Sequence, residues 1–309
     1  FKAHELIKTL VSHGADINAQ DNDGATATLI AAENSNSKAI EALAENEADM
    51  NLKDNYHQSA LYVAIVKNKA EVIKILASQD SVNQNHEYSD GNNFLHISAK
   101  EGCDKSIKAL IESDIDDTLK EKLNEEGLSP LHIAAQHNKT QALETLVENG
   151  CDIDSKTGDG KRNALIIAIE KGNIETVGKL IELGVNVNQK LGGKKTPLHF
   201  AAQFGQAEIA QLLIKKGANI DAKTARGNTN LHVAAMRNKI EVAQALIINK
   251  ANVNEKNNRK ENSLYLALTK DSTKDKVPHY NIADLLLESG SNTQVTGVAL
   301  INHPQLLIS

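Results

Sequence analysis

The chain has 309 residues and carries 34 Lys and Arg against 40 Asp and Glu, a formal net charge of −6. Hydrophobic residues make up 40% but aromatic residues only 3%, with no Trp, so we expect thin core layers of Leu, Ile, Val and Ala. No apolar run approaches the roughly 20 residues that span a membrane, which argues against membrane insertion. Net acidity and sparse aromatics argue against nucleic-acid binding.

Residues 1–20 read as an amphipathic helix followed by the turn sequence Gly14-Ala15-Asp16-Ile17-Asn18. The chain begins without Met and inside this helix, so we expect a fragment whose first unit is incomplete. The two cysteines, Cys103 and Cys151, form no disulfide framework, which favours a reducing compartment such as the cytoplasm.

The clearest unit along the chain is residues 191–223, which contain a T-P-L-H-x-A-A motif. Thr196 is a good helix cap, and Pro197 suits the first helical turn, where its missing N–H costs nothing. Gly205 separates two short helical patterns, and Gly217 stands where a left-handed cap is wanted. The unit therefore predicts a helix–turn–helix followed by a tight connector.

The position of Leu198 recurs at intervals of 33 to 36 residues. The equivalent residues are Thr28, Leu61, Leu95, Leu131, Leu165, Leu231 and Leu264. This motif and a period near 33 resemble an ankyrin repeat, and the resemblance covers nearly the whole chain. It implies an all-α repeat solenoid of helix–turn–helix units with β-hairpin connectors.

The period divides one domain, residues 1–309, into a partial repeat (1–20) and eight further repeats. These are residues 21–53, 54–87, 88–123, 124–157, 158–190, 191–223, 224–256 and 257–293, with 294–309 as a degenerate C-terminal cap or, alternatively, the start of a ninth repeat. Unit 88–123 has extra residues, predicting a turn or short helical piece through 119–123. Residues 270–280 predict a longer loop between helices, whose role the sequence leaves open.

Four histidines occupy one repeat position, at the start of the first helix of their units: His96, His132, His199 and His232. Copies one repeat apart cannot converge on one metal ion, and the resemblance implies that they tie neighbouring connectors together. Cys103 and Cys151 lack the His and acidic partners of a nucleophile. We therefore expect no catalytic residues, metal or cofactor.

In the implied architecture, connector tips and the exposed positions of first helices line a concave face. Large residues there are Phe204, Met236 and Arg237, with His137 at an equivalent position. Tyr56 and Leu128 are weaker candidates at the tips. Aromatic residues, Met and Arg are enriched in the cores of protein interfaces. The alternative is that Phe204 covers the turn between its two helices.

Charge is divided along the chain. Residues 1–150 carry 13 Lys and Arg against 25 Asp and Glu, giving −12, whereas residues 151–309 carry 21 against 15, giving +6. The cationic connector positions are Lys161, Arg162, Lys194, Lys195, Arg226, Arg259 and Lys260. Such a stripe would attract an acidic segment of a partner; the alternative is a solvated edge.

These patterns predict a monomeric, non-catalytic protein-binding scaffold in the cytoplasm, or in a host cytosol if the protein is a secreted effector. The alternative is a targeting segment of a larger effector, enzyme or toxin whose active part lies elsewhere. The Asn-, Lys- and Ile-rich repeats resemble those of secreted effectors of intracellular bacteria and of ankyrin-rich arthropod toxins.

Overall fold

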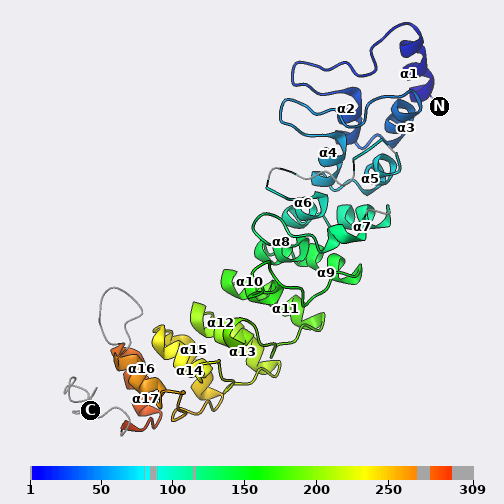
Figure 1. Ribbon diagram of the computed structural model, residues 1–309. Helices are drawn as coiled ribbons and strands as arrows, with labels where there is room; N and C mark the ends of the chain where they lie inside the picture. The colour runs from blue at the N-terminus through cyan, green and yellow to red at the C-terminus, as the bar shows by residue number, and fades with distance from the viewer. Residues whose placement is uncertain are drawn as a thin grey trace. The chain divides into compact units, whose positions relative to one another are not determined.

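The computed structural model describes residues 2–79, 81–83, 88, 90–113, 116–269 and 279–293. The chain divides into two compact units, Phe1–Gly158 and Asp159–Ser309, hereafter the first and the second unit. Each is a stack of short antiparallel helix pairs (Figure 1).

The first unit holds nine α-helices and one 3-10 turn among its described residues. These are α1 (Lys2–Ser12), α2 (Ala27–Glu33), α3 (Ser37–Glu45), α4 (Ala60–Val66), α5 (Ala70–Ala77), α6 (Phe94–Glu101), α7 (Asp104–Glu112), η1 (Asp117–Lys120), α8 (Pro130–Gln136) and α9 (Thr140–Glu148). Helices α2, α4, α6 and α8 form one layer, each against the next, and α1, α3, α5, α7 and α9 form the other.

The second unit repeats this arrangement. Its elements are α10 (Ala164–Lys171), α11 (Ile174–Glu182), η2 (Gly192–Lys194), α12 (Pro197–Phe204), α13 (Ala207–Lys215), α14 (Asn230–Met236), α15 (Ile240–Ile248), α16 (Ser263–Thr269) and α17 (Tyr280–Glu288). Helices α10, α12, α14 and α16 stack in one layer, and α11, α13, α15 and α17 in the other. The predicted all-α repeat architecture is therefore confirmed within each unit.

Helix α12 shows why these short helices form where they do. Thr196 caps it in extended conformation, Pro197 occupies its first turn, and His199 completes a capping box with Thr196. Gly205 ends it in the left-handed conformation, with φ of 79°, which glycine adopts at little cost. Local sequence therefore sets both ends of the helix.

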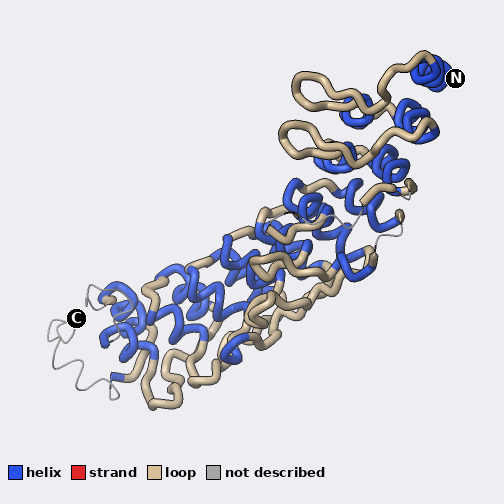
Figure 2. The backbone as a smooth tube through the Cα atoms, turned by 45° about the horizontal axis from the view of Figure 1, so that its top comes forward, coloured by secondary structure: helices blue, strands red, loops and turns tan. Residues whose placement is uncertain are grey.

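The connectors between helix pairs are loops that close in tight turns at their tips. Figure 2 shows helices and loops only in the described part of the chain, and two isolated bridges, Lys53–Ser59 and Leu191–Lys195, are what remains of β structure there. The Asp54 carboxylate accepts from the N–H groups of Tyr56 and Gln58 at 2.9 and 2.8 Å. This side-chain turn closes the tip without a strand ladder, so the predicted hairpins are short turns.

The core lies between the two layers of each stack. Leu198, Leu231 and Leu264 are fully buried, and the paired alanines Ala201 and Ala202 let neighbouring helices approach closely. In the first unit Leu61, Leu95 and Leu131 are buried at the same repeat position, and the repeat that contains α2 has the smaller, polar Thr28 there, which is also buried. The thin aliphatic layers expected from composition are therefore present in both units.

Two features predicted from the sequence lie outside the described residues, namely most of the 270–280 insertion and the 294–309 cap. The helical piece expected through 119–123 is the 3-10 turn Asp117–Lys120, which begins and ends slightly earlier. The repeat limits and the single-domain organisation stay predictions.

Candidate functional site

The second unit has a hollow of about 370 Å³ between α12, α14 and the connectors that precede them. Three of its lining residues are cationic: Lys195, Arg226 and Arg237. Met236 contributes apolar surface, and Gln203, Thr224 and Asn228 contribute neutral polar groups. We call this the cationic hollow; no carboxylate is among the described residues that line it.

Hydrogen bonds hold the connectors at its rim. The N–H of Ala225 donates to the carbonyl of Gly193 at 2.8 Å, which joins two successive tips. The Oγ1 of Thr224 accepts from the N–H of Asn228 at 3.2 Å and closes the second turn. Arg226 therefore projects from a fixed backbone, and less entropy is lost when it binds a ligand.

In three successive repeats of the second unit, the residue before the cap of the first helix contacts the residue eight positions later. Lys195 Nζ donates to Gln203 Oε1 at 2.8 Å and lies 5.2 Å from the centre of the Phe200 ring. At the same position one repeat earlier, Arg162 pairs with Glu170 at 3.2 Å. Because Gln203 is neutral, it leaves the charge of Lys195 uncompensated in this contact.

The surroundings of Lys195 disfavour its charge. Burial lowers the pKa of this ammonium group, and repulsion from Arg237 and Arg226 lowers it further, against an opposing effect of Glu170. Clustered positive charge that is partly withdrawn from water attracts an anion more strongly than an exposed lysine does. The hollow is therefore suited to a carboxylate.

The predicted interface residues are only partly brought together. Met236, half-buried, and Arg237, exposed, line the cationic hollow with Lys195 and Arg226. Phe204 is 37% exposed at the end of α12 but is not among the lining residues. Whether it belongs to the same binding patch stays a prediction.

The other cationic tip residues lie elsewhere in the second unit. Lys161 pairs with Asp159 at 3.7 Å, and Arg162 with Glu170. Lys194, Arg259 and Lys260 are exposed at their connector tips, outside the lining of the cationic hollow. Of the seven cationic tip residues predicted from the sequence, only Lys195 and Arg226 line the cationic hollow.

In the first unit, Tyr56 is 71% exposed at a connector tip, and His137 is exposed at the C-terminus of α8. Leu128 is wrong as an exposed candidate, because it is only 3% exposed. Its carbonyl accepts from His96 Nε2 at 2.9 Å, so the residue belongs to the packing between neighbouring repeats.

The repeated histidines are buried structural groups. The N–H of Thr196 donates to His199 Nδ1 at 3.1 Å, and His199 Nε2 donates to the carbonyl of Asn228 at 3.1 Å. Burial lowers the pKa of His199 to about 4, so the ring is neutral at pH 7. No group of three or more His, Cys, Asp or Glu in the described part of the chain is placed to hold a metal ion.

Both cysteines are free thiols and buried. Burial raises the pKa of Cys103, and it raises the pKa of Cys151 to about 12. Because the thiolate is the reactive form, both side chains are poor nucleophiles at neutral pH.

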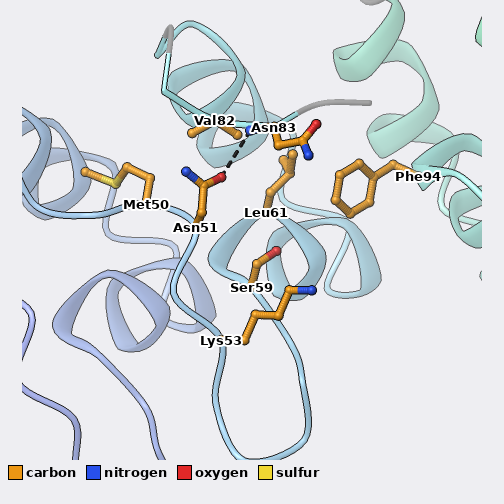
Figure 3. Close-up of a pocket in the computed structure, with 8 residues that line it drawn as sticks. All are labelled: Met50, Asn51, Lys53, Ser59, Leu61, Val82, Asn83 and Phe94. Carbon is orange, nitrogen blue, oxygen red and sulfur yellow. Dashed lines mark hydrogen bonds between the residues drawn. The ribbon is translucent and has the colours of Figure 1, made fainter. Parts of the chain in front are cut away.

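A hollow of about 280 Å³ in the first unit is lined half by buried core side chains and half by polar residues (Figure 3). Met50, Leu61 and Phe94 contribute apolar walls and are at most 4% exposed. The N–H of Asn83 donates to Asn51 Oδ1 at 3.0 Å and joins two connectors there (Figure 3). This hollow is a seam between stacked repeats.

Two lining residues of the cationic hollow, Gln203 and Asn228, are not among the interface candidates chosen from the sequence. They are repeat-equivalent to Glu170 and Lys195 respectively, so the register could have drawn attention to both. The repeat register does not show that the side chain before a helix cap reaches the residue eight positions later, near the end of that helix, as Lys195 reaches Gln203.

Comparison with known proteins agrees with these observations. The family profile described as "Ankyrin repeats (3 copies)" matches residues 1–87, 80–157, 156–224 and 198–296. The chain belongs to the ankyrin repeat family. The predicted resemblance is thereby confirmed over most of its length.

Among curated ankyrin relatives, the mouse NF-kappa-B p105 subunit is 36% identical over 91 residues, 29% of this chain and 9% of that protein. The mouse B-cell lymphoma 3 protein homolog is 30% identical over 102 residues, 33% of this chain and 23% of the relative. Alpha-latrotoxin-Lt1a of Latrodectus tredecimguttatus is 30% identical over 112 residues, which are 36% of this chain and 8% of the toxin. The matched segments thus span under a quarter of these relatives.

Two solved ankyrin repeat domains share the fold. That of Bcl-3, described as a unique member of the IkappaB protein family, has a TM-score of 0.61 and 26% identity, covering 73% of this chain and 99% of its own. The ankyrin repeat domain of human ASB11 has a TM-score of 0.60 and 23% identity, and the match covers 76% of this chain and 99% of the ASB11 domain. In the described ankyrin repeats, no helix is both long and apolar enough to cross a membrane.

Proposed function

We propose that this ankyrin repeat domain is a non-catalytic protein-binding module that holds an acidic segment of its partner in the cationic hollow. The supporting observation is the approach of Lys195, Arg226 and Arg237 around a cavity whose described lining contains no carboxylate. Ankyrin repeat domains are generally interaction modules, which supports the coarser part of the proposal.

Recognition would combine charge with a small apolar contact. An arginine guanidinium can bind a carboxylate through two parallel hydrogen bonds, and Arg226 and Arg237 are both exposed at the hollow. The thioether of Met236 offers an adaptable apolar surface beside them. Individual exposed ion pairs contribute only about 0–1 kcal/mol, so the partner segment must make several at once.

The test is a binding titration with a fluorescein-labelled peptide of about twelve residues, which spans at most about 40 Å when extended. Glu or Asp alternates with Leu and Ser in this peptide. Replacing Lys195 and Arg226 by Glu should weaken binding at least about tenfold, and the weakening should shrink as salt shortens the screening length from about 10 Å at 0.1 M.

The matched control replaces Lys215 and Lys216 by Glu, since both are exposed and lie at the C-terminal end of the outer helix α13. It changes the net charge equally but leaves the cationic hollow intact. Equal loss of binding in control and test variants would show a general charge effect and contradict the proposal. Unchanged melting temperatures establish that both variants are folded.

Three single substitutions map the extent of the site. Met236→Ala and Arg237→Ala should each weaken peptide binding by about 1–3 kcal/mol, as interface hot spots do. Phe204→Ala should leave the short peptide unaffected, because Phe204 does not line the cationic hollow. A natural partner that is weakened by Phe204→Ala would extend the interface to the end of α12.

A second proposal is that the domain serves as a recognition segment within a larger effector, enzyme or toxin. The observation that favours it is that the curated relatives are much longer than their matched segments. We further propose a monomer acting in the cytoplasm, where the two free thiols would stay reduced. The natural reading frame and light scattering of the purified protein test these points.

A further inference from the structure

The first unit carries a binding surface of opposite character. Two adjoining hollows of about 550 and 340 Å³ share Tyr56, Gln58 and Tyr62 among their lining residues. They lie along α2, α4 and α6 and the described residues of the connectors before these helices, and the connectors before α2 and α4 extend as long loops on the same side (Figure 1). We call the joined hollows the tyrosine groove.

Aromatic side chains are concentrated in this groove. It is lined by Tyr56, Tyr62 and Tyr88, three of the five tyrosines in a chain that is only 3% aromatic. The rings of Tyr62 and Tyr88 pack with centres 5.8 Å apart, whereas Tyr56 is 71% exposed. Ile30, 47% exposed, adds an apolar contact at the other end. Tyrosines of this kind are typical of interface cores.

The charge around the groove is negative. Its lining includes six carboxylates and two ammonium groups: Asp21, Asp23, Glu33, Asp54, Asp90 and Glu101 against Lys67 and Lys100. One of the lysines, Lys67, is already paired with Glu33 at 3.5 Å. The excess of carboxylates beside tyrosine rings favours a cationic ligand, because a cation is attracted both by acids and by the face of an aromatic ring.

The rim is held in place before any ligand arrives. The N–H and side-chain amide of Asn55 donate to the carbonyls of Asp23 and Asn22 at 3.0 and 3.1 Å, joining two successive tips. Asp54 accepts the turn hydrogen bond from the N–H of Tyr56 itself. A preorganised rim reduces the entropic cost of binding.

We propose that the tyrosine groove binds an extended basic segment of a partner protein, in which Lys or Arg alternates with an apolar residue. The cations lie against Tyr56 and the rim carboxylates, and the apolar side chain packs on Ile30 and the groove floor. This surface is separate from the cationic hollow in location, charge and ligand.

The test uses the full chain and a fluorescein-labelled peptide of about twelve residues in which Lys or Arg alternates with Leu and Ser, long enough to span about 40 Å. Two further peptides replace every cation by Glu, or every Leu by Ser. Tyr56→Ala should weaken binding of the basic peptide at least about tenfold, the effect expected of an aromatic anchor. Both altered peptides should bind at least about tenfold more weakly than the basic peptide.

A second variant, Asp21→Asn, Asp23→Asn and Asp54→Asn together, removes three charges but keeps the amide oxygens that can close the turns at Asp21 and Asp54. It should weaken binding about tenfold at low salt and less at about 0.5 M. Its matched control is Glu41→Gln, Glu71→Gln and Glu148→Gln, at exposed positions on α3, α5 and α9, which should change affinity less than about twofold.

Any of four results overturns the proposal. These are no saturable binding of the basic peptide at millimolar concentration, equal binding of either altered peptide, equal binding by Tyr56→Ala, or equal losses in the Asn variant and its Gln control. The Lys195→Glu, Arg226→Glu variant should bind the basic peptide normally, so failure of this proposal is distinguishable from failure of the cationic hollow.

Discussion

Arg162 and Lys195 occupy the same position in successive repeats but face different residues eight positions later. Arg162 meets the carboxylate of Glu170, whereas Lys195 meets the neutral amide of Gln203. One repeat further on, Asn228 stands opposite Met236, with Nδ2 and Sδ 4.0 Å apart. The change of a single side chain on the helix therefore decides whether the cation is compensated within its own repeat or available to a ligand.

The buried histidines make stability depend on pH. His96, His199 and His232 have pKa values lowered chiefly by burial, that of His199 to about 4, while an unfolded chain binds the proton near pH 6.5. A neutral ring is favoured in the folded state, so stability is complete above about pH 6.5 and falls as pH drops toward 4. The free energy of unfolding from urea titrations should decrease by about 3 kcal/mol for His199 alone.

The control for this prediction is His199→Gln. Without a titrating ring, the variant should be less stable at pH 7 but should lose less stability between pH 7 and pH 4.5 than the original chain. An identical loss in both proteins would show that His199 does not carry the effect.

At the scale of the element, the connectors are as constrained as the helices. Gly227 ends a tip with φ of 76°, and a Cβ there would lie 2.7 Å from the backbone nitrogen of Asn258 in the next connector. Gly217 has a similar φ of 87° after α13, but nothing lies within 4 Å of the same hypothetical atom. The two glycines therefore have the same backbone conformation, but only at Gly227 would an added Cβ clash with a neighbouring connector.

Gly227→Ala should therefore destabilise the chain more than Gly217→Ala. Both pay about 1–2 kcal/mol for a left-handed residue with a Cβ, and Gly227 adds a clash between connectors worth about 1–3 kcal/mol. Urea or thermal unfolding of the two variants measures the difference directly. Equal destabilisation would show that the spacing between successive tips adjusts without cost.

At the scale of the whole molecule, stability comes from contacts between neighbouring repeats. Helix α12 packs on α10 and α14 in its own layer, and α13 on α11 and α15. Helix α2 has α4 as its layer neighbour, its repeat has Thr28 at the buried anchor position, and Glu47 takes the positive φ of 62°. These features make the repeat that contains α2 and α3 the weaker layer.

Hydrogen exchange measured by mass spectrometry should show this difference in the full chain. We expect residues 27–45 to exchange faster than residues 197–215, because α2 is stacked on one side within its layer, whereas α12 is stacked on both, and a helix stacked on one side opens more readily. Slower exchange in residues 27–45 would mean that local sequence outweighs the number of stacked neighbours.

Much of the fold could be read from the sequence because its determinants are local. The 33-residue period defined the helix pairs, and Thr196, Pro197 and Gly205 placed the ends of α12 within one stretch of ten residues. The turn at the tip before α4 is also local, since Asp54 closes it with residues two and four positions away. The capping role of the histidines likewise uses a partner three residues earlier.

The binding surfaces depended on the tertiary structure. Leu128 looked exposed because its place at a tip says nothing of the neighbouring repeat that covers it, and the cationic hollow draws residues from two repeats about 30 positions apart. Tyr56, Tyr62 and Tyr88 likewise share one groove because successive connectors and helices stack in register. Repeat spacing sets which backbone segments are neighbours; side-chain length, direction and burial across that spacing decide which charges and rings meet.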